Sequence, residues 1–153
     1  MVSSPVSPAT RTAEAPGTPG GQSAFISYAS QDRRQALRVA TTLEDAGIGV
    51  WLDVLNIPGG HSYGPEIVDG IRGSTALLVL CSTASLTSRN VRQEVQLAWR
   101  YGRPILPLRL EDVTFPDDLA YWLEGAQWID VLDQPPAAWL PRVEAALARF
   151  AGG

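Results

Sequence analysis

The chain has 153 residues, of which 45% are hydrophobic and 18% are charged, and its formal net charge is −4. This length suits one domain with one core, and the composition is too apolar for a disordered chain and too interrupted by charge for a membrane protein. All twelve basic residues are arginines, which excludes P-loop, Schiff-base and phospho-acceptor sites that need a lysine, and the negative charge argues against nucleic-acid binding.

The cysteine and histidine content predicts a reducing compartment. Cys81 and His61 are each the single residue of their kind, so an internal disulfide and the Cys/His zinc patterns are excluded and a cytoplasmic location is expected. Residues 1–22 are rich in proline, glycine and serine and lack the apolar segment of a signal peptide. We therefore predict a disordered tail before a domain at residues 23–150. A transit peptide is less favoured, because Arg11 is the only basic side chain of the tail.

The first half of the chain predicts two strands and two helices separated by a loop. Ser30 is a candidate N-cap, and Gly47 stands where a helix-ending glycine belongs. The Pro-Gly-Gly run at 58–60 forbids a regular element. The predicted strands cover residues 24–28 and 49–52, the predicted helices cover residues 32–46 and 63–72, and the loop covers residues 53–62.

The second half predicts three further strands. Residues 75–81 are nearly all apolar, as expected for a strand covered on both faces by helices. Pro107 suggests that its strand lies near an edge or is irregular. The predicted strands cover residues 75–81, 105–110 and 127–131, the predicted helices cover residues 89–101, 119–123 and 137–150, and residues 82–88 are expected to be a polar connection.

Five strands that alternate with helices require crossover connections and therefore a parallel sheet between two layers of helices. We predict an α/β, flavodoxin-like sandwich with strand order 2-1-3-4-5. In such a sheet ligands bind beyond the carboxyl ends of the strands, at the switch point between the first and third strands. This places a candidate site among residues 27–32, 81–88 and 53–62.

Several segments, taken in order and spacing, resemble those of bacterial TIR (Toll/interleukin-1 receptor) domains. They are Phe25-Ile26-Ser27-Tyr28 with Asp32, Gly49-Val50-Trp51-Leu52-Asp53, Ile57-Pro58-Gly59, Leu77-Leu78-Val79-Leu80-Cys81-Ser82, the helix of Glu94, and Pro104-Ile105-Leu106-Pro107-Leu108. The resemblance extends from Ala24 to about Phe150. It implies a flavodoxin-like fold that either self-assembles as a signalling scaffold or cleaves NAD⁺ at its nicotinamide bond.

The resemblance implies that Glu94 is the catalytic residue, because enzymatic members carry a Glu on the helix after the third strand. Those members frequently have Trp four residues earlier, where this chain has Asn90. At 100° per residue, Glu94 borders the apolar stripe formed by Val91, Val95 and Ala98. One carboxylate is enough for this chemistry, because nicotinamide leaves as a neutral molecule and the ribose becomes a cation. The alternative is a solvent-exposed Glu paired with a neighbouring Arg.

Other polar and aromatic residues at the same edge are candidates for binding substrate. Alternatives stand beside them: Ser30 as a helix cap, Arg33 as a solvated cation, Asp53 as a turn residue, and Ser82 and Ser85 as residues that only turn the chain. Trp51 is expected in the core, Cys81 is expected to act first as a small hydrophobe, and no metal site is expected. The candidate substrate-binding residues are Tyr28, Ser30, Arg33, Asp53, Tyr63, Ser82 and Ser85.

The favoured function is an NAD⁺ glycohydrolase of bacterial defence or signalling, with NAD⁺ as substrate and no cofactor. Its activity is expected to depend on a homo-oligomer or filament formed through TIR–TIR contacts, with a sensor or effector protein as a further partner. The alternative is a non-catalytic TIR scaffold. A nucleoside deoxyribosyltransferase and a flavodoxin are less favoured readings of the same fold. The expected assembly loop contains Ile57, Pro58, Gly59 and Gly60.

Overall fold

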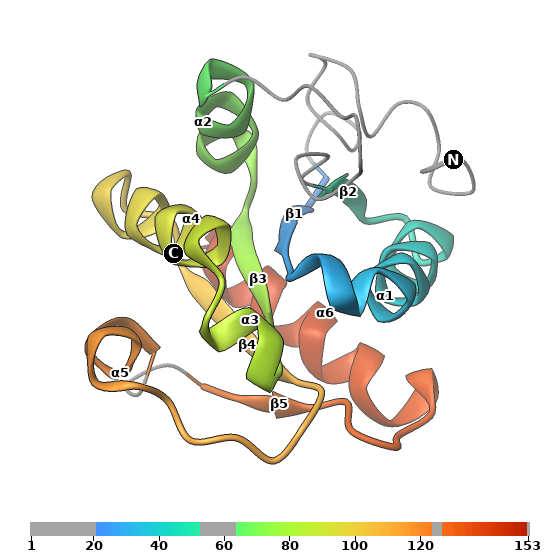
Figure 1. Cartoon of the computed structure of the whole chain (residues 1–153). Helices are drawn as coiled ribbons and strands as arrows, with labels where there is room; N and C mark the ends of the chain where they lie inside the picture. Colours follow the sequence, from blue (N-terminus) through green and yellow to red (C-terminus); the bar gives the residue numbers. More distant parts are fainter. Residues whose placement is uncertain (1–20, 53–63, 124–126, 153) are drawn as a thin grey trace.

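A computed structural model describes residues 21–52, 64–123 and 127–152. Its sheet has five parallel strands in the order β2-β1-β3-β4-β5, which confirms the predicted flavodoxin-like topology (Figure 1). The connection order reverses between β1 and β3, so the switch point lies where it was expected. The strands are β1 (Ser23–Ser27), β2 (Gly49–Leu52), β3 (Ala76–Cys81), β4 (Ile105–Arg109) and β5 (Ile129–Asp130).

Helices cover both faces of the sheet. α1 and α6 pack on one face, and α2, α4 and α5 pack on the other (Figure 1). The helical elements are η2 (Ser30–Asp32), α1 (Arg33–Asp45), α2 (Gly64–Gly73), α3 (Thr83–Leu86), α4 (Arg89–Arg100), α5 (Asp117–Leu123) and α6 (Pro136–Gly152). None of the helices in the described residues is long and apolar enough to cross a membrane.

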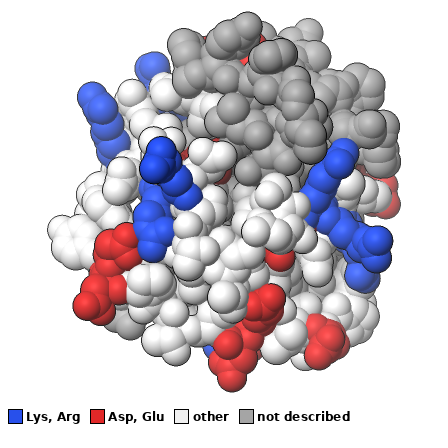
Figure 2. All heavy atoms as spheres, in the orientation of Figure 1, with Lys and Arg blue, Asp and Glu red and all other residues white. Residues whose placement is uncertain are grey.

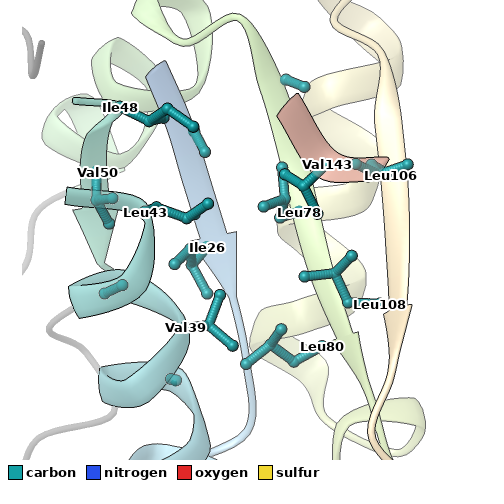
Figure 3. Packing of buried hydrophobic residues seen from close by; sticks show 14 of the residues in the cluster. Ile26, Val39, Leu43, Ile48, Val50, Leu78, Leu80, Leu106, Leu108 and Val143 are labelled. Atoms are coloured by element: carbon teal, nitrogen blue, oxygen red, sulfur yellow. The ribbon is translucent and has the colours of Figure 1, made fainter. Parts of the chain in front are cut away.

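Alternation along β1 divides the core into two clusters. Ala24 and Ile26 belong to the cluster under α1 and α6, which Figure 3 shows with the leucines of β3 and β4 and the apolar side of α1. Phe25 belongs to the cluster under α2, α4 and α5. Because successive side chains of a strand point to opposite faces, Ser27 shares the face of Phe25. The end of β1 therefore presents a hydroxyl to the α4 side of the sheet.

Two local predictions about caps had different outcomes. Gly47 follows the end of α1 with φ of +86°, which confirms the expected helix-ending glycine. Ser30 was expected to cap the first helix and does not. It is the first residue of η2, its exposed hydroxyl donates to Gln31 Oε1 at 3.2 Å, and the N-cap position is Ala29.

The segment 82–88 was expected to be an irregular connection, but it contains the short helix α3. A reciprocal capping box creates this helix: Ser82 Oγ accepts from Ser85 N at 3.0 Å, and Ser82 N donates to Ser85 Oγ at 2.8 Å. The predicted strand at 127–131 is shorter than expected, because only Ile129 and Asp130 pair with β4. The predicted tail at residues 1–22 falls almost wholly outside the described residues.

Trp51 is buried, as predicted, and it stacks on Phe25 with ring centroids 6.2 Å apart. This pair lies against Gly70 of α2, where an added Cβ would stand 2.9 Å from Trp51 Cδ2 and 3.0 Å from Phe25 Cε2. Both rings are large and buried, so they have little room to move away. The helix α2 can approach the sheet this closely because Gly70 has no side chain.

We therefore expect Gly70→Ala to destabilise the fold by about 1–3 kcal/mol, the usual cost of overpacking a core. Thermal unfolding followed by circular dichroism measures this change. Gly73→Ala is the matched control, since an added Cβ at Gly73 meets nothing within 4 Å. Equal melting temperatures for the two variants would contradict the packing explanation.

Candidate functional site

A buried hydrogen bond joins the end of β1 to the helix that follows β3. Ser27 Oγ donates to Glu94 Oε1 at 2.6 Å, and the two residues are 0% and 3% exposed. Ser27 is the last residue of β1, at the carboxyl edge and beside β3 in the sheet. The Glu94 carboxylate is thus held at the switch point, where ligands bind in sheets of this type.

The sequence of α4 explains why this carboxylate turns inward. Ser88 caps the helix by accepting a hydrogen bond from Val91 N at 3.2 Å, which fixes where the helix begins. Val91, Val95 and Ala98 are fully buried against the sheet, and Glu94 is buried with them. The alternative of a solvent-exposed Glu94 is therefore wrong. Asn90, one turn earlier, is half-buried.

A second carboxylate lies at the same edge. Asp32, at the end of η2, is 7% exposed, and its Oδ2 accepts a short hydrogen bond from Ser82 Oγ. Ser82 follows β3 and caps α3, so this contact connects the segment after β1 to the segment after β3. Glu111, after β4, accepts from Thr83 N at 2.9 Å and from Thr83 Oγ1 at 3.0 Å. Three segments at the carboxyl edge therefore meet at the start of α3.

The Asp32 carboxylate is in an unfavourable electrostatic position. Burial raises the pKa of this carboxyl above its ordinary value of 3.8, the hydrogen bond from Ser82 opposes that shift, and the negative charge of Glu111 adds to it. Within the described residues, no ion pair includes Asp32. A buried charge held by a hydroxyl instead of a cation is costly to the folded state.

The structure separates the predicted substrate-binding residues into different environments. Tyr28 is 2% exposed in the core cluster under α1 and α6, on the opposite face from Glu94. Ser30 is exposed, and Arg33 lines an open groove along α1. Ser82 and Ser85 are fully buried and hydrogen-bond each other in the cap of α3. Of this set, Ser82 has the more direct link to a buried carboxylate, that of Asp32.

Other predicted residues lie outside the described residues. They are Asp53 and Tyr63 among the substrate-binding candidates, and Ile57, Pro58, Gly59 and Gly60 of the expected assembly loop.

Sequence reasoning placed Ser27 in a candidate segment of the site, residues 27–32, but did not single it out as a site residue. The signal was present, because Phe25 is apolar and Ser27 is the next position on the same face of the strand. A small polar residue there can reach the helix that covers this face. Asp32 was noted after the first strand but was not singled out, since a pairing with Ser82 across 50 residues of sequence depends on the tertiary structure.

Two surface grooves of the described residues lie away from Ser27 and Glu94. One of about 460 Å³ runs between α1 and the segment that leads into α6, with Arg38, Leu110, Asp133 and Trp139 among its lining residues. Neither this groove nor the open one along α1 includes Ser27 or Glu94 in its described lining. No group of three potential metal ligands occurs within residues 21–52, 64–123 and 127–152.

The charges on the visible face are mixed. Figure 2 shows acidic side chains along its lower part and arginines above them on either side, so the described residues form no continuous basic surface on this face. Cys81, at the end of β3, is buried, and burial raises the pKa of its thiol to about 12. The thiol is therefore protonated at neutral pH and acts as a small apolar group, as predicted.

Comparison with known proteins identifies the family. The model of the TIR domain family matches residues 24–144. The chain belongs to the TIR domain family. A curated relative, the 2′ cyclic ADP-D-ribose synthase AbTIR of Acinetobacter baumannii, is 38% identical to this TIR chain over 60 residues. That alignment covers 39% of this chain and 22% of the relative, so most of the relative's length has no counterpart in the alignment.

Solved structures agree on the fold of this TIR domain. The TIR domain of the Toll-related receptor TRR-2 from Hydra magnipapillata gives a TM-score of 0.66 at 19% identity, with 82% of this chain and 97% of that chain covered. The Clostridium botulinum CMP N-glycosidase BcmB gives 0.57 at 14% identity, with 82% and 99% covered. The TIR domains of the activated Roq1 resistosome give 0.50 at 18% identity, with 86% and 84% covered.

We expect Asp32→Asn to stabilise the TIR domain at pH 7, because the amide oxygen still accepts from Ser82 while the cost of the buried charge disappears. Since the folded-state pKa of Asp32 is raised, its unfavourable contribution is absent below pH 3.8 and develops as the pH rises through the folded-state pKa. Chemical denaturation at a series of pH values measures the difference. A variant less stable than wild type at pH 7 would contradict this account.

Proposed function

We propose that this TIR domain cleaves NAD⁺ at the bond between nicotinamide and ribose, with Glu94 as the catalytic carboxylate and no cofactor. The observation that carries the proposal is the buried Glu94 carboxylate, held by Ser27 at the switch point of the sheet. Two comparisons support the same class of chemistry: the curated relative is named as a cyclic ADP-ribose synthase, and one protein of the same fold is a CMP N-glycosidase.

The bond electrons leave with nicotinamide, which departs as a neutral molecule, and positive charge develops on the ribose. A carboxylate in a site without water stabilises that charge strongly, because the local dielectric is low. Capture of the cation by water, with loss of a proton, gives ADP-ribose. Capture by a nucleophile of the same ADP-ribose, again with loss of a proton, gives a cyclic product. The Ser27 hydroxyl orients the carboxylate and does not enter the bond changes.

The burial of Glu94 supports the proposal that activity depends on self-assembly. At 3% exposure, the side chain contacts a bound ribose only after its surroundings rearrange. We infer that association with further copies of the TIR domain supplies this rearrangement, in a bacterial defence or signalling role in the cytoplasm. Head-to-tail contacts that do not close on themselves extend into filaments.

Nicotinamide release from NAD⁺ measured by chromatography tests the proposal, at low and at high protein concentration and with a crowding agent. We expect specific activity to rise with concentration. Glu94→Gln should lower it by about 100-fold or more, the usual loss when one preorganised group that stabilises the transition state is removed. Ser27→Ala should cost about tenfold, as expected for a hydrogen bond to a charged group.

Glu144→Gln is the matched control, because Glu144 is exposed on α6 at the other face of the sheet. Activity that survives in Glu94→Gln would show that another residue is the catalytic one. An absence of release under every condition, with folded protein, would favour the alternative of a non-catalytic scaffold.

One observation supports a surface for TIR–TIR contacts, which the scaffold role, the second candidate function, requires and which the proposed activity also uses. Trp99 of α4 is 54% exposed and Tyr121 of α5 is 72% exposed, and both rings pack against Trp122, with centroids 5.0 and 4.9 Å from it. A cluster of exposed aromatic rings is typical of a protein–protein contact surface. We propose that α4 and α5 contribute to TIR–TIR contacts.

Replacing Trp99 and Tyr121 together by Ala should lower the average mass of the protein at high concentration, measured by sedimentation velocity. Leu132→Ala is the control, because Leu132 is a large exposed apolar residue outside this cluster. If the double variant associates as wild type does, the aromatic cluster is not a contact surface.

A further inference from the structure

The two buried carboxylates at the carboxyl edge are each held by a serine hydroxyl from a neighbouring segment. Glu94 accepts from Ser27, and Asp32 accepts from Ser82. The proposed chemistry uses one carboxylate and leaves Asp32 without a function. Yet Asp32 is 7% exposed and close enough to Glu111 for mutual repulsion. A buried charge in such a position does not stabilise the fold. We therefore ask what the hydrogen bond that Asp32 accepts from Ser82 contributes.

Asp32 holds the start of α3. Ser82 Oγ donates to Asp32 and at the same time accepts from Ser85 N, so the carboxylate fixes the hydroxyl proton in the direction that leaves a lone pair for the helix cap. α3 ends at Leu86 and α4 begins at Arg89, and Ser88 N donates to Ser85 O at 3.0 Å between them. The cap of α3 is therefore connected by hydrogen bonds to the cap of α4.

We propose that Asp32 is a positioning residue for the Glu94 site. It acts through Ser82 and the start of α3, and it sets where α4 lies relative to the end of β1, which fixes the contact between Ser27 and Glu94. This inference deepens the proposed function. The expected effect of Asp32 on catalysis rests on the proposal that Glu94 cleaves NAD⁺. A displacement of α4 by about 1 Å is enough to lower the rate of a positioned reaction, by up to about 100-fold.

The chain offers a matched pair of serines for the test. Ser74 precedes β3 and Ser82 follows it, both are at most 2% exposed, and Ser74 Oγ donates to Gly70 O at 2.7 Å. Ser74→Ala therefore removes a buried hydrogen bond at the amino edge of the sheet, at the opposite end of β3 from Ser82. This variant measures the cost of losing one buried serine hydrogen bond that makes no contact with Asp32 or Ser82.

The experiment compares Asp32→Ala, Asp32→Asn, Ser82→Ala and Ser74→Ala with wild type in the full chain. Amide hydrogen exchange by mass spectrometry reports the protection of residues 82–94, and nicotinamide release gives kcat and KM. We expect Asp32→Ala and Ser82→Ala to lose protection in that segment and to lower kcat by about tenfold with little change in KM. Ser74→Ala should leave both unchanged, and Asp32→Asn, which keeps the acceptor, should restore both.

Unchanged protection of residues 82–94 in Asp32→Ala would overturn the inference. So would a kcat of Asp32→Asn as low as that of Glu94→Gln with protection intact, because the charge of Asp32 would then act directly on the substrate. If wild type releases no nicotinamide, the proposed function fails while hydrogen exchange still decides whether Asp32 positions α4. The two failures are thus distinguishable.

Discussion

The hydrogen bond from Ser27 to Glu94 is the contact on which the carboxyl edge depends. It places a carboxylate between Ser27, the last residue of β1, and the covering helix α4, on which Val91 and Val95 are buried in the apolar cluster of this face. A carboxylate that loses its hydrogen-bond donor in such a place keeps the desolvation cost and loses the compensation. The positions of β1 and α4 are therefore coupled through this polar contact as well as through apolar packing.

The fold could be predicted from the sequence because its signals are local and agree with one another. The apolar runs of β1 and β3, the periodic apolar positions of α1 and α4, and the glycine after α1 each indicate an element by itself. Spacings too long for hairpins then require crossovers and a parallel sheet. The order β2-β1-β3-β4-β5 does not follow from these signals alone; it was predicted as the usual arrangement of a five-stranded parallel sheet of this size, and the structure confirms it.

The site was less predictable because its contacts join residues far apart in the chain. The helical spacing placed Glu94 beside the apolar stripe. Its contact with Ser27 depends on how α4 packs on β1, which the sequence does not specify. In the same way, the sequence alone allowed Ser82 and Ser85 to be simple turn residues. The structure shows that they form the capping box of α3 and that Ser82 donates to Asp32. Tyr28 and Ser30 follow the first strand as expected for a binding loop, yet one side chain enters the opposite core cluster and the other faces solvent.

The buried charges of Asp32 and Glu94 lower the stability of the carboxyl edge, whereas the proposed activity requires the charge of Glu94. An apolar residue in place of Asp32 would remove a desolvated charge, but it would also remove the acceptor that holds Ser82. An amide would keep the acceptor at lower electrostatic cost, so the predicted gain in stability of Asp32→Asn is the quantity that separates charge from hydrogen bonding here. At Glu94 the charge itself is required by the proposed chemistry. The two carboxylates therefore differ in kind: in this account, one is needed for the bond it accepts and the other for the charge it carries.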